Sequence, residues 1–252
     1  MSITICASDF SIHVNAFSDI MDDATSLFLY RFTVPQLRVL CVALHLPSTV
    51  TTSSRDYVPC IEALAMTCRR LAEPCQMYHV ANEFGRSSGA VSRIVKTAIT
   101  APDGLVVSMY GLVGGRLHDS MVLSMCGILD TISLIPELNG HMMYGDLAYG
   151  CRPHLCCPFS NVPHGSNADN FNKSMSSVRE AVEWSFHLIK CLWSFMDWSK
   201  TQKDQQLPIG QLWIVCVLLT NCHTCLQPMG NQISMYFICK PPSLEEMLTA
   251  HD

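Results

Sequence analysis

The chain has 252 residues, of which 49% are hydrophobic and 15% are charged, and its formal net charge is −5. That length allows one large domain or two modest ones, each with a buried core, and the apolar content excludes a disordered chain. The longest apolar run, residues 212–219, is far shorter than the roughly 20 residues of a spanning helix, so we expect no membrane partner.

The charge is distributed unevenly along the chain. Residues 1–28 hold four Asp and no basic residue, which predicts an acidic N-terminal tail. Residues 29–100 hold eight Lys or Arg against four acidic residues, and residues 101–252 hold eight basic against thirteen acidic residues. This asymmetry indicates a middle region that faces nucleic acid and an acidic remainder.

The 14 cysteines would indicate disulfides in a secreted protein. However, the N-terminal Met-Ser-Ile-Thr-Ile has no basic residue before an apolar run and no cleavage pattern. We therefore expect a reducing compartment, the nucleus or the cytoplasm, with most thiols buried as small hydrophobic groups.

The region from residue 29 to residue 100 has helical periodicity and no strand pattern. Apolar residues recur at helical spacing over residues 32–46 and again over residues 57–71, with a Ser/Thr-rich loop at residues 48–54 between them. We expect this region to form a helical unit separate from the rest of the chain.

Residues 77–96 fit a helix-turn-helix, with a turn at Gly85 and a second helix capped by Ser87 or Ser88. A helical hairpin inside an all-α core explains the same spacing, and that alternative stays open. In the first interpretation the second helix binds DNA. The candidate nucleic-acid-binding residues are Arg86, Ser88, Ser92, Arg93 and Lys96.

The remainder of the chain mixes strands and helices. We expect strands at residues 105–110 and 141–144, a loop at residues 151–166, and helices at residues 120–129, from Asn172 onward, and at residues 210–226. This alternation predicts an α/β layer sandwich.

Two carboxylates in this region are candidates for phosphoryl-transfer chemistry, which needs hard oxygen ligands for divalent ions. Asp146 follows a predicted strand, and Glu183 lies at the margin of the apolar face of a predicted helix. Each also has a structural interpretation. Asp146 is suited to a turn in which it binds its own backbone, and Glu183 to a surface pair with Arg179 or His187.

Three further patterns carry less chemistry. Asp119 is suited to a helix N-cap or to a place in the acidic cluster, and Asp103 to the turn of a Pro-Asp-Gly bend. The pair Cys222 and Cys225 has zinc-like spacing, but two cysteines one turn apart on an apolar helix give the same pattern.

The motifs together resemble the catalytic domain of Harbinger-type DDE transposases and the nucleases derived from them. The segments that carry the resemblance are Tyr-Gly-Asp-Leu-Ala-Tyr at 144–149, the stretch 171–193, Pro-Asp-Gly-Leu at 102–105, Gly-Arg-Leu-His-Asp-Ser at 115–120, Pro-Pro-Ser-Leu-Glu-Glu at 241–246, Arg-Arg-Leu at 69–71 and Phe-Gly-Arg-Ser at 84–87.

The resemblance implies an RNase H-like nuclease layer sandwich at residues 101–252, preceded by the all-α helix-turn-helix-like region at residues 29–100. It implies Asp146 and Glu183 as catalytic residues, with Asp119 as a further metal ligand. The implied cofactor is Mg²⁺ or Mn²⁺, and the implied partners are DNA, the divalent metal and a protein partner.

The resemblance also implies an absence. In the family a first catalytic Asp stands in an Asp-Gly context on the opening strand of the nuclease sheet, before the Pro-Asp-Gly turn. Here Thr100 runs directly into Ala101. We therefore expect a truncated fold that lacks this strand, and two hypotheses follow: a catalytically impaired, metal-binding nuclease, or a non-catalytic DNA- or protein-binding remnant of a transposase.

Overall fold

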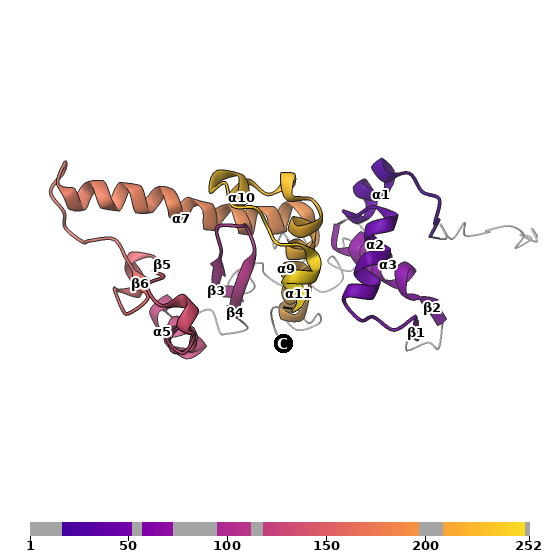
Figure 1. Cartoon of the computed structure of the whole chain (residues 1–252), viewed down its shortest axis with the longest axis horizontal. Coiled ribbons are helices and arrows are strands. Elements are labelled where there is room, and N and C mark those ends of the chain that lie inside the picture. The colour runs from indigo at the N-terminus through magenta and orange to yellow at the C-terminus, as the bar shows by residue number, and fades with distance from the viewer. Residues whose placement is uncertain (1–16, 52–56, 73–94, 112–117, 197–208, 250–252) are drawn as a thin grey trace, which may run out of the picture.

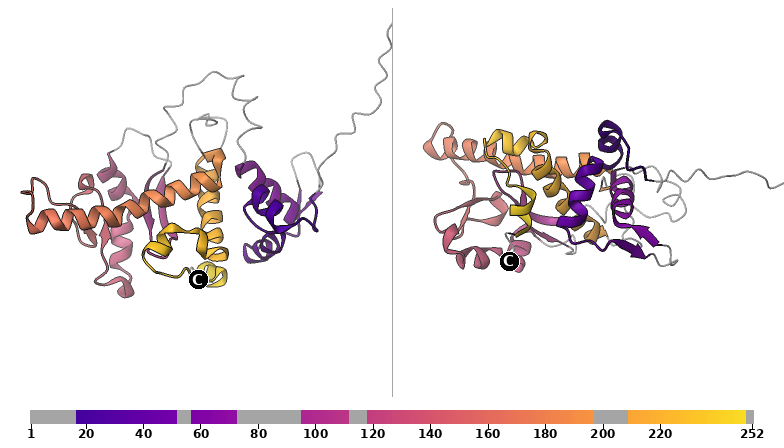
Figure 2. Two further views of the ribbon diagram at one scale, coloured as in Figure 1. Left: turned by 90° about the horizontal axis from the view of Figure 1, so that it is seen from above. Right: turned by 45° about the vertical axis from the view of Figure 1, so that its right-hand side comes forward.

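The computed structural model describes residues 17–51, 57–72, 95–111, 118–196 and 209–249. Its longest element is helix α7 (Asn167–Leu192), whose 26 residues span about 39 Å at 1.5 Å per residue. Most of the later elements lie along this helix, while the N-terminal helices lie beyond its C-terminal end (Figure 1). Strands β5 (Met143–Tyr144) and β6 (Leu155–Cys156) lie near its N-terminal half. The hairpin of β3 (Val95–Thr100) and β4 (Val106–Gly111) lies near its middle, and helix α9 (Ile209–Leu226) near its C-terminal end. Figure 2 shows that α9 also lies between the hairpin and helices α1 to α3.

Three helices form near the N-terminus, and the first turns of the first two are capped. Asp22 accepts a hydrogen bond from the Thr25 amide, and Thr33 forms a capping box with Gln36. The predicted helices over residues 32–46 and 57–71 are confirmed with shorter or shifted ends. The three helices are α1 (Asp23–Tyr30), α2 (Val34–Ala43) and α3 (Cys60–Ala72).

The prediction that residues 29–100 contain no strand is wrong. Strands β1 (Thr49–Thr51) and β2 (Tyr57–Pro59) pair in antiparallel fashion, and β3 (Val95–Thr100) follows. The reason lies in the β-branched and aromatic side chains of these segments, which suit a pleated strand better than a loop or helix.

Most of the predicted helix-turn-helix lies outside the described residues, including Arg86, Ser88, Ser92 and Arg93. Lys96 is described, and its backbone belongs to β3 rather than to a helix. The second helix of the predicted motif therefore does not extend to Lys96.

Strand β4 (Val106–Gly111) pairs antiparallel with β3, and the predicted strand at residues 105–110 is confirmed. The connecting turn has the chemistry expected of Pro-Asp-Gly. The Gly104 amide donates to the Ala101 carbonyl at 2.9 Å, and the Leu105 amide donates to Asp103 Oδ1 at 3.0 Å. Gly104 has φ +87, where a side chain would be strained. The prediction that Asp103 is a turn residue is confirmed.

The next segment is built from short elements. The single helix predicted at residues 120–129 is two helices, because Gly127 adopts a left-handed conformation with φ +63 and ends the first of them. The predicted N-cap role of Asp119 is wrong, since the N-cap is His118 and Asp119 is the first helical residue. The elements are α5 (Asp119–Cys126), α6 (Ile128–Ser133), η3 (Pro136–Leu138), β5 (Met143–Tyr144), η4 (Leu147–Tyr149) and β6 (Leu155–Cys156).

Strands β5 and β6 pair in parallel, with Met143 opposite Leu155. The strand predicted at residues 141–144 is confirmed in shorter form, but β6 lies inside the predicted loop at residues 151–166. Its two residues are too few to produce a period-two pattern that sequence reasoning can detect.

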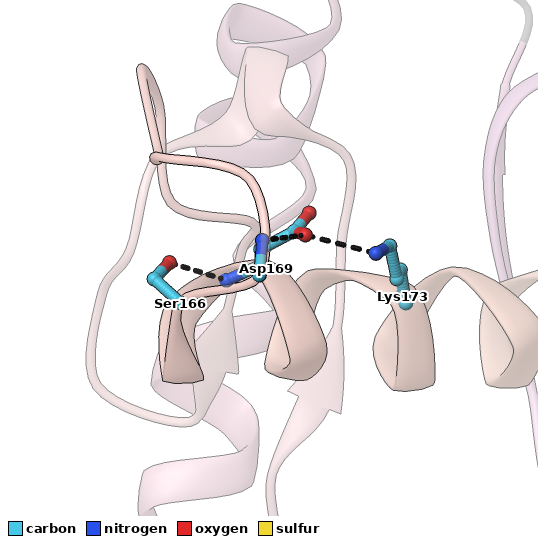
Figure 3. Close-up of polar contacts among 4 residues, drawn as sticks. Ser166, Asp169 and Lys173 are labelled. Atoms are coloured by element: carbon cyan, nitrogen blue, oxygen red, sulfur yellow. Dashed lines mark hydrogen bonds and ion pairs between the residues drawn. The ribbon is translucent and has the colours of Figure 1, made fainter.

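Helix α7 begins five residues before the predicted Asn172 because its N-terminus is fixed by side chains (Figure 3). Ser166 Oγ accepts from the Asp169 amide at 3.2 Å. Asp169 Oδ2 accepts from the Gly165 amide and from Lys173 Nζ, each at 2.8 Å. The elements that follow are η5 (Ser194–Met196), α9 (Ile209–Leu226), η6 (Pro228–Gly230), α10 (Gln232–Tyr236) and α11 (Leu244–Thr249).

One buried cluster joins the N-terminal helices to the C-terminal ones. Leu37 and Leu40 of α2 and Cys68 of α3 share it with Trp193 at the end of α7 and with Cys216 of α9, all of them fully buried. The expected separation of residues 29–100 from the rest is therefore wrong at the level of packing, because the apolar face of each short helix needs the other for burial.

The described strands form three separate two-stranded sheets, β1–β2, β3–β4 and β5–β6. The mixed helix and sheet content agrees with the predicted α/β class, while the RNase H-like layering stays a prediction. None of the helices in the described ranges combines the length and the apolarity that crossing a membrane would require.

Candidate nuclease site

Asp146 lies between β5 and η4, at the point where the strand ends. Its Oδ1 accepts a hydrogen bond from the Leu147 amide at 2.6 Å, so it caps the short helix that follows. This is the turn role that the sequence allowed as an alternative. The second carboxylate oxygen, Oδ2, lies close to a residue of helix α7.

Arg179, near the middle of α7, forms the contact between that helix and Asp146. Its Nη2 lies 3.5 Å from Asp146 Oδ2, with the Arg179 side chain 31% exposed and the Asp146 side chain 57% exposed. The sequence suggested Arg179 only as a surface partner of Glu183. Its pairing with Asp146 could not be read from helical spacing, because the two residues come from different elements.

Glu183 follows Arg179 by one turn of α7 and is exposed. Residues four apart on a helix share a face, with Cβ atoms about 6 Å apart. Among the described residues no ion pair joins Glu183 to Arg179 or to His187, so the surface pair that the sequence left open as an alternative is not formed. The side of α7 that meets Asp146 is thus the side that also carries Glu183.

The loop that holds Asp146 is anchored from behind. Gly145 is buried, and its amide donates to the Cys156 carbonyl of β6 at 2.9 Å. A Cβ at this position would lie 2.9 Å from Leu155 Cδ1 and 3.3 Å from Tyr149 Cδ2, so only glycine fits without displacing neighbours. This close packing fixes the backbone from which the carboxylate projects.

The thiols of this region belong to the packing. Cys151 Sγ accepts from the Cys157 amide at 3.4 Å, and burial raises the pKa of the Cys157 thiol, with Cys151 as the second cause. Burial also raises the pKa of Cys222 to about 12 and that of Cys225 to about 11. Cys222 and Cys225 belong to no group of three or more possible metal ligands among the described residues, which leaves their spacing to the packing of an apolar helix.

Asp119, the further predicted metal ligand, opens a helix that packs against the turn after Asp146, since α5 contacts η4. The backbone of Asp119 opens α5, while its side chain lies outside the described part of the chain. Within the described residues there is no group of three or more His, Cys, Asp or Glu side chains able to hold a metal ion. That Asp146 and Glu183 share one divalent ion stays a prediction.

A family model described as a DDE superfamily endonuclease matches residues 68–221, more than half of the chain. The chain belongs to this family. The match includes the β3–β4 hairpin, Asp146 and the whole of α7, and it begins inside α3 rather than at residue 101. No curated protein and no solved structure matched the DDE endonuclease chain.

DDE endonucleases generally use divalent metals, so the donor set must be compared with that requirement. Carboxylate oxygens are the ligands that Mg²⁺ and Mn²⁺ prefer. Asp146 and Glu183 supply two such groups, and Arg179 already balances one of them. In the described part of the chain these two carboxylates are the candidate ligands for a divalent ion, and metal binding stays a prediction.

Proposed function

We propose that the chain is a Harbinger transposase-derived, nuclease-like protein of the nucleus or cytoplasm that acts on DNA phosphodiester bonds and is catalytically impaired. The observation that carries the proposal is the Asp146–Arg179 contact. It brings the acid at the end of β5 against the helix that carries Glu183, inside the range that matches DDE endonucleases.

In this proposal Asp146 and Glu183 hold one divalent ion, with Asp119 as a further candidate ligand. A bound ion would stabilise charge that develops on the phosphate oxygens. The chain's own part is to orient the two carboxylates, through the buried Gly145 loop for Asp146 and through the backbone of α7 for Glu183.

The impairment follows from the number of acids. Carboxylates that resemble the second and third family acids are present, and the segment that would supply the first is absent from the sequence between Thr100 and Ala101. Neither Asp103, which is fixed in the hairpin turn, nor Asp119, at the start of α5, takes its place in the order of motifs. Loss of one preorganised charged group costs about 10²-fold or more in rate.

The test is cleavage of duplex DNA by the purified protein with Mn²⁺. We expect undetectable cleavage, or cleavage at least about 100-fold below that of a complete homologue, for the reason just given. Robust cleavage that disappears in the Glu183→Ala variant would show that the site is complete, and Asp119→Ala would then be the next variant to measure.

The second candidate function is a non-catalytic DNA- or protein-binding remnant. It is favoured by the excess of basic residues in residues 29–100, which contain eight Lys or Arg and four Asp or Glu. Binding through phosphates weakens as salt rises, because counterions are released on binding.

This candidate is tested by the salt dependence of duplex binding in the wild type and in the Arg93→Ala/Lys96→Ala double variant. We expect lower affinity in the variant and a shallower dependence on salt, by about one unit of log–log slope for each phosphate that the variant no longer neutralises. An affinity for duplex DNA that changes neither with salt nor with the substitutions would exclude DNA contact by this region and favour the helical-hairpin interpretation.

A further inference from the structure

We propose that Arg179 is a resident cation of the site, which occupies the Asp146 carboxylate and competes with a divalent metal for it. The inference deepens the proposed function and rests on it, because it concerns the same two carboxylates. It assigns to Arg179 a positioning role that holds Asp146 against α7 while no metal is bound.

The geometry supports an occupied carboxylate. Asp146 Oδ1 accepts from the Leu147 amide at 2.6 Å, and Oδ2 lies 3.5 Å from Arg179 Nη2. Both oxygens therefore have a neighbour of opposite polarity. A metal ion that took Oδ2 as a ligand would lie close to the guanidinium, and the repulsion between the two cations opposes their binding to the same carboxylate.

The position of Arg179 makes its charge specific to this site. It lies four residues before Glu183, on the same face of α7, so the residue that contacts Asp146 also carries its charge on the face that bears Glu183. Two carboxylates carry a charge of −2, and Arg179 reduces the sum to −1. A divalent ion is attracted less strongly by this set than by two carboxylates alone, and it is also repelled by the arginine.

The side-chain exposures set the size of the effect. Arg179 is 31% exposed and Asp146 57% exposed, so water screens the pair and the guanidinium can be displaced without unfolding the helix. Removing the charge should therefore strengthen metal binding by a modest factor, roughly three- to tenfold, which is the range of an exposed to half-exposed charge pair.

The experiment measures the dissociation constant of Mn²⁺ alone from the full chain by electron paramagnetic resonance of free Mn²⁺, at low salt and without DNA. We expect the Arg179→Gln variant to bind Mn²⁺ roughly three- to tenfold more tightly than the wild type, and Arg179→Lys, which keeps the charge, to bind close to the wild type. Asp146→Asn should abolish the binding in either background.

A matched control is Lys190→Gln, which removes the same charge from an exposed position of the same helix, three turns beyond Arg179. It should leave the dissociation constant unchanged, because a charge at that distance is screened by solvent. An equal gain in Lys190→Gln and Arg179→Gln would mean that only net charge matters and would overturn the resident-cation proposal.

Two further outcomes separate this proposal from the proposed function. If Arg179→Gln and the wild type bind Mn²⁺ equally and both lose it with Asp146→Asn, the metal site stands and the resident cation is refuted. If no variant binds Mn²⁺ at millimolar concentration, both are refuted. Circular dichroism of each variant establishes that the helix content is kept, as expected for a half-exposed side chain.

Discussion

Asn231 is 1% exposed and uses both ends of its side-chain amide. Its Nδ2 donates to the Gly104 carbonyl at 3.1 Å and to Thr224 Oγ1 at 2.9 Å, and its Oδ1 accepts from the Ile233 amide at 2.9 Å. One side chain therefore joins the β3–β4 turn to α9 and caps α10. The pattern of apolar residues in the sequence does not predict this role, because a lone Asn in Gly-Asn-Gln is typical of a surface turn.

Replacing Asn231 with Ala leaves the Gly104 carbonyl and the Ile233 amide buried without their partner. We expect the free energy of unfolding to fall by about 2–4 kcal/mol, the cost of two unsatisfied buried polar groups. Urea unfolding followed by circular dichroism measures the loss. The neighbouring Gln232→Ala variant, at an exposed position, should change stability by about 0.5 kcal/mol or less.

His223 is a second single residue with a large expected effect, because it makes the free energy of unfolding depend on pH. Burial lowers the pKa of this imidazole to about 4, with the charge of Arg31 as the second cause, and its ring meets the Phe32 ring edge to face at 5.8 Å. The folded state thus keeps His223 neutral, while the unfolded chain protonates it near pH 6.5. Between these two pKa values the unfolded state binds the extra proton, so acid destabilises the fold.

We expect His223 to account for a loss of about 1 kcal/mol in unfolding free energy between pH 7 and pH 5.5, with the loss complete only below pH 4. Urea unfolding at the two pH values measures it. The His223→Gln variant, whatever its absolute stability, should lose about 1 kcal/mol less over this interval than the wild type. An identical pH dependence in both proteins would contradict the assignment.

At the scale of elements, the C-terminal end of α7 is fixed to α9 by one indole. Trp193 is fully buried, and its Nε1 donates to Thr220 Oγ1 at 3.0 Å. Thr220 Oγ1 in turn donates to the Cys216 carbonyl at 2.7 Å. The helix that carries Arg179 and Glu183 is therefore held at its end by a buried contact with the largest cluster of the described core.

The Trp193→Phe substitution removes the indole N–H and leaves a void beside Thr220. We expect a loss of about 1–3 kcal/mol in unfolding free energy from the missing hydrogen bond and the smaller ring. Thermal unfolding measures it, with Trp184→Phe as control. Trp184 is only half-buried and meets Tyr236 at the surface, so its replacement should cost clearly less.

Elements with strong local signals can be predicted from the sequence. Helix α9, strand β4 (predicted at residues 105–110) and the Pro-Asp-Gly turn all follow from periodicity and turn chemistry, which act over a few residues. Strands β1, β2 and β6 escape prediction because they have two or three residues each, and the early start of α7 does so because Ser166 and Asp169 fix it before the apolar face begins.

The candidate site can be predicted in part. Motifs single out Asp146 and Glu183. The residue that contacts Asp146 is Arg179, but its spacing in the sequence suggests Glu183 as its partner. Helical spacing shows that Arg179 can reach Glu183 and gives no information about a strand end 33 positions earlier in the chain. Contacts between elements depend on the packing of the whole chain, which a single sequence does not encode locally.

At the scale of the whole molecule, two clusters of unequal size contain most of the buried apolar residues in the described ranges. The larger joins α2, α3, the end of α7 and α9. The smaller contains only Leu123, Leu155 and Cys157, supported by partly buried neighbours from α5, α6 and β5. The second cluster supports the β5–β6 pair and, through Gly145, the loop of Asp146.

Stability within a folded protein varies with local apolar burial, so the two clusters should open independently and at different free energies. In native-state hydrogen exchange with low urea, the amides of Met143 and Gly145, which donate to carbonyls in and beside β6, should exchange through a partial opening that leaves Ile189 and Leu219 protected. Equal protection at all four positions would mean a single cooperative unit.

In the expected case, Asp146 leaves α7 repeatedly while the helix stays folded. Assembly of the two acids is then an equilibrium in its own right, and anything that bridges them, whether a cation or a nucleic acid, would slow the exchange of β5.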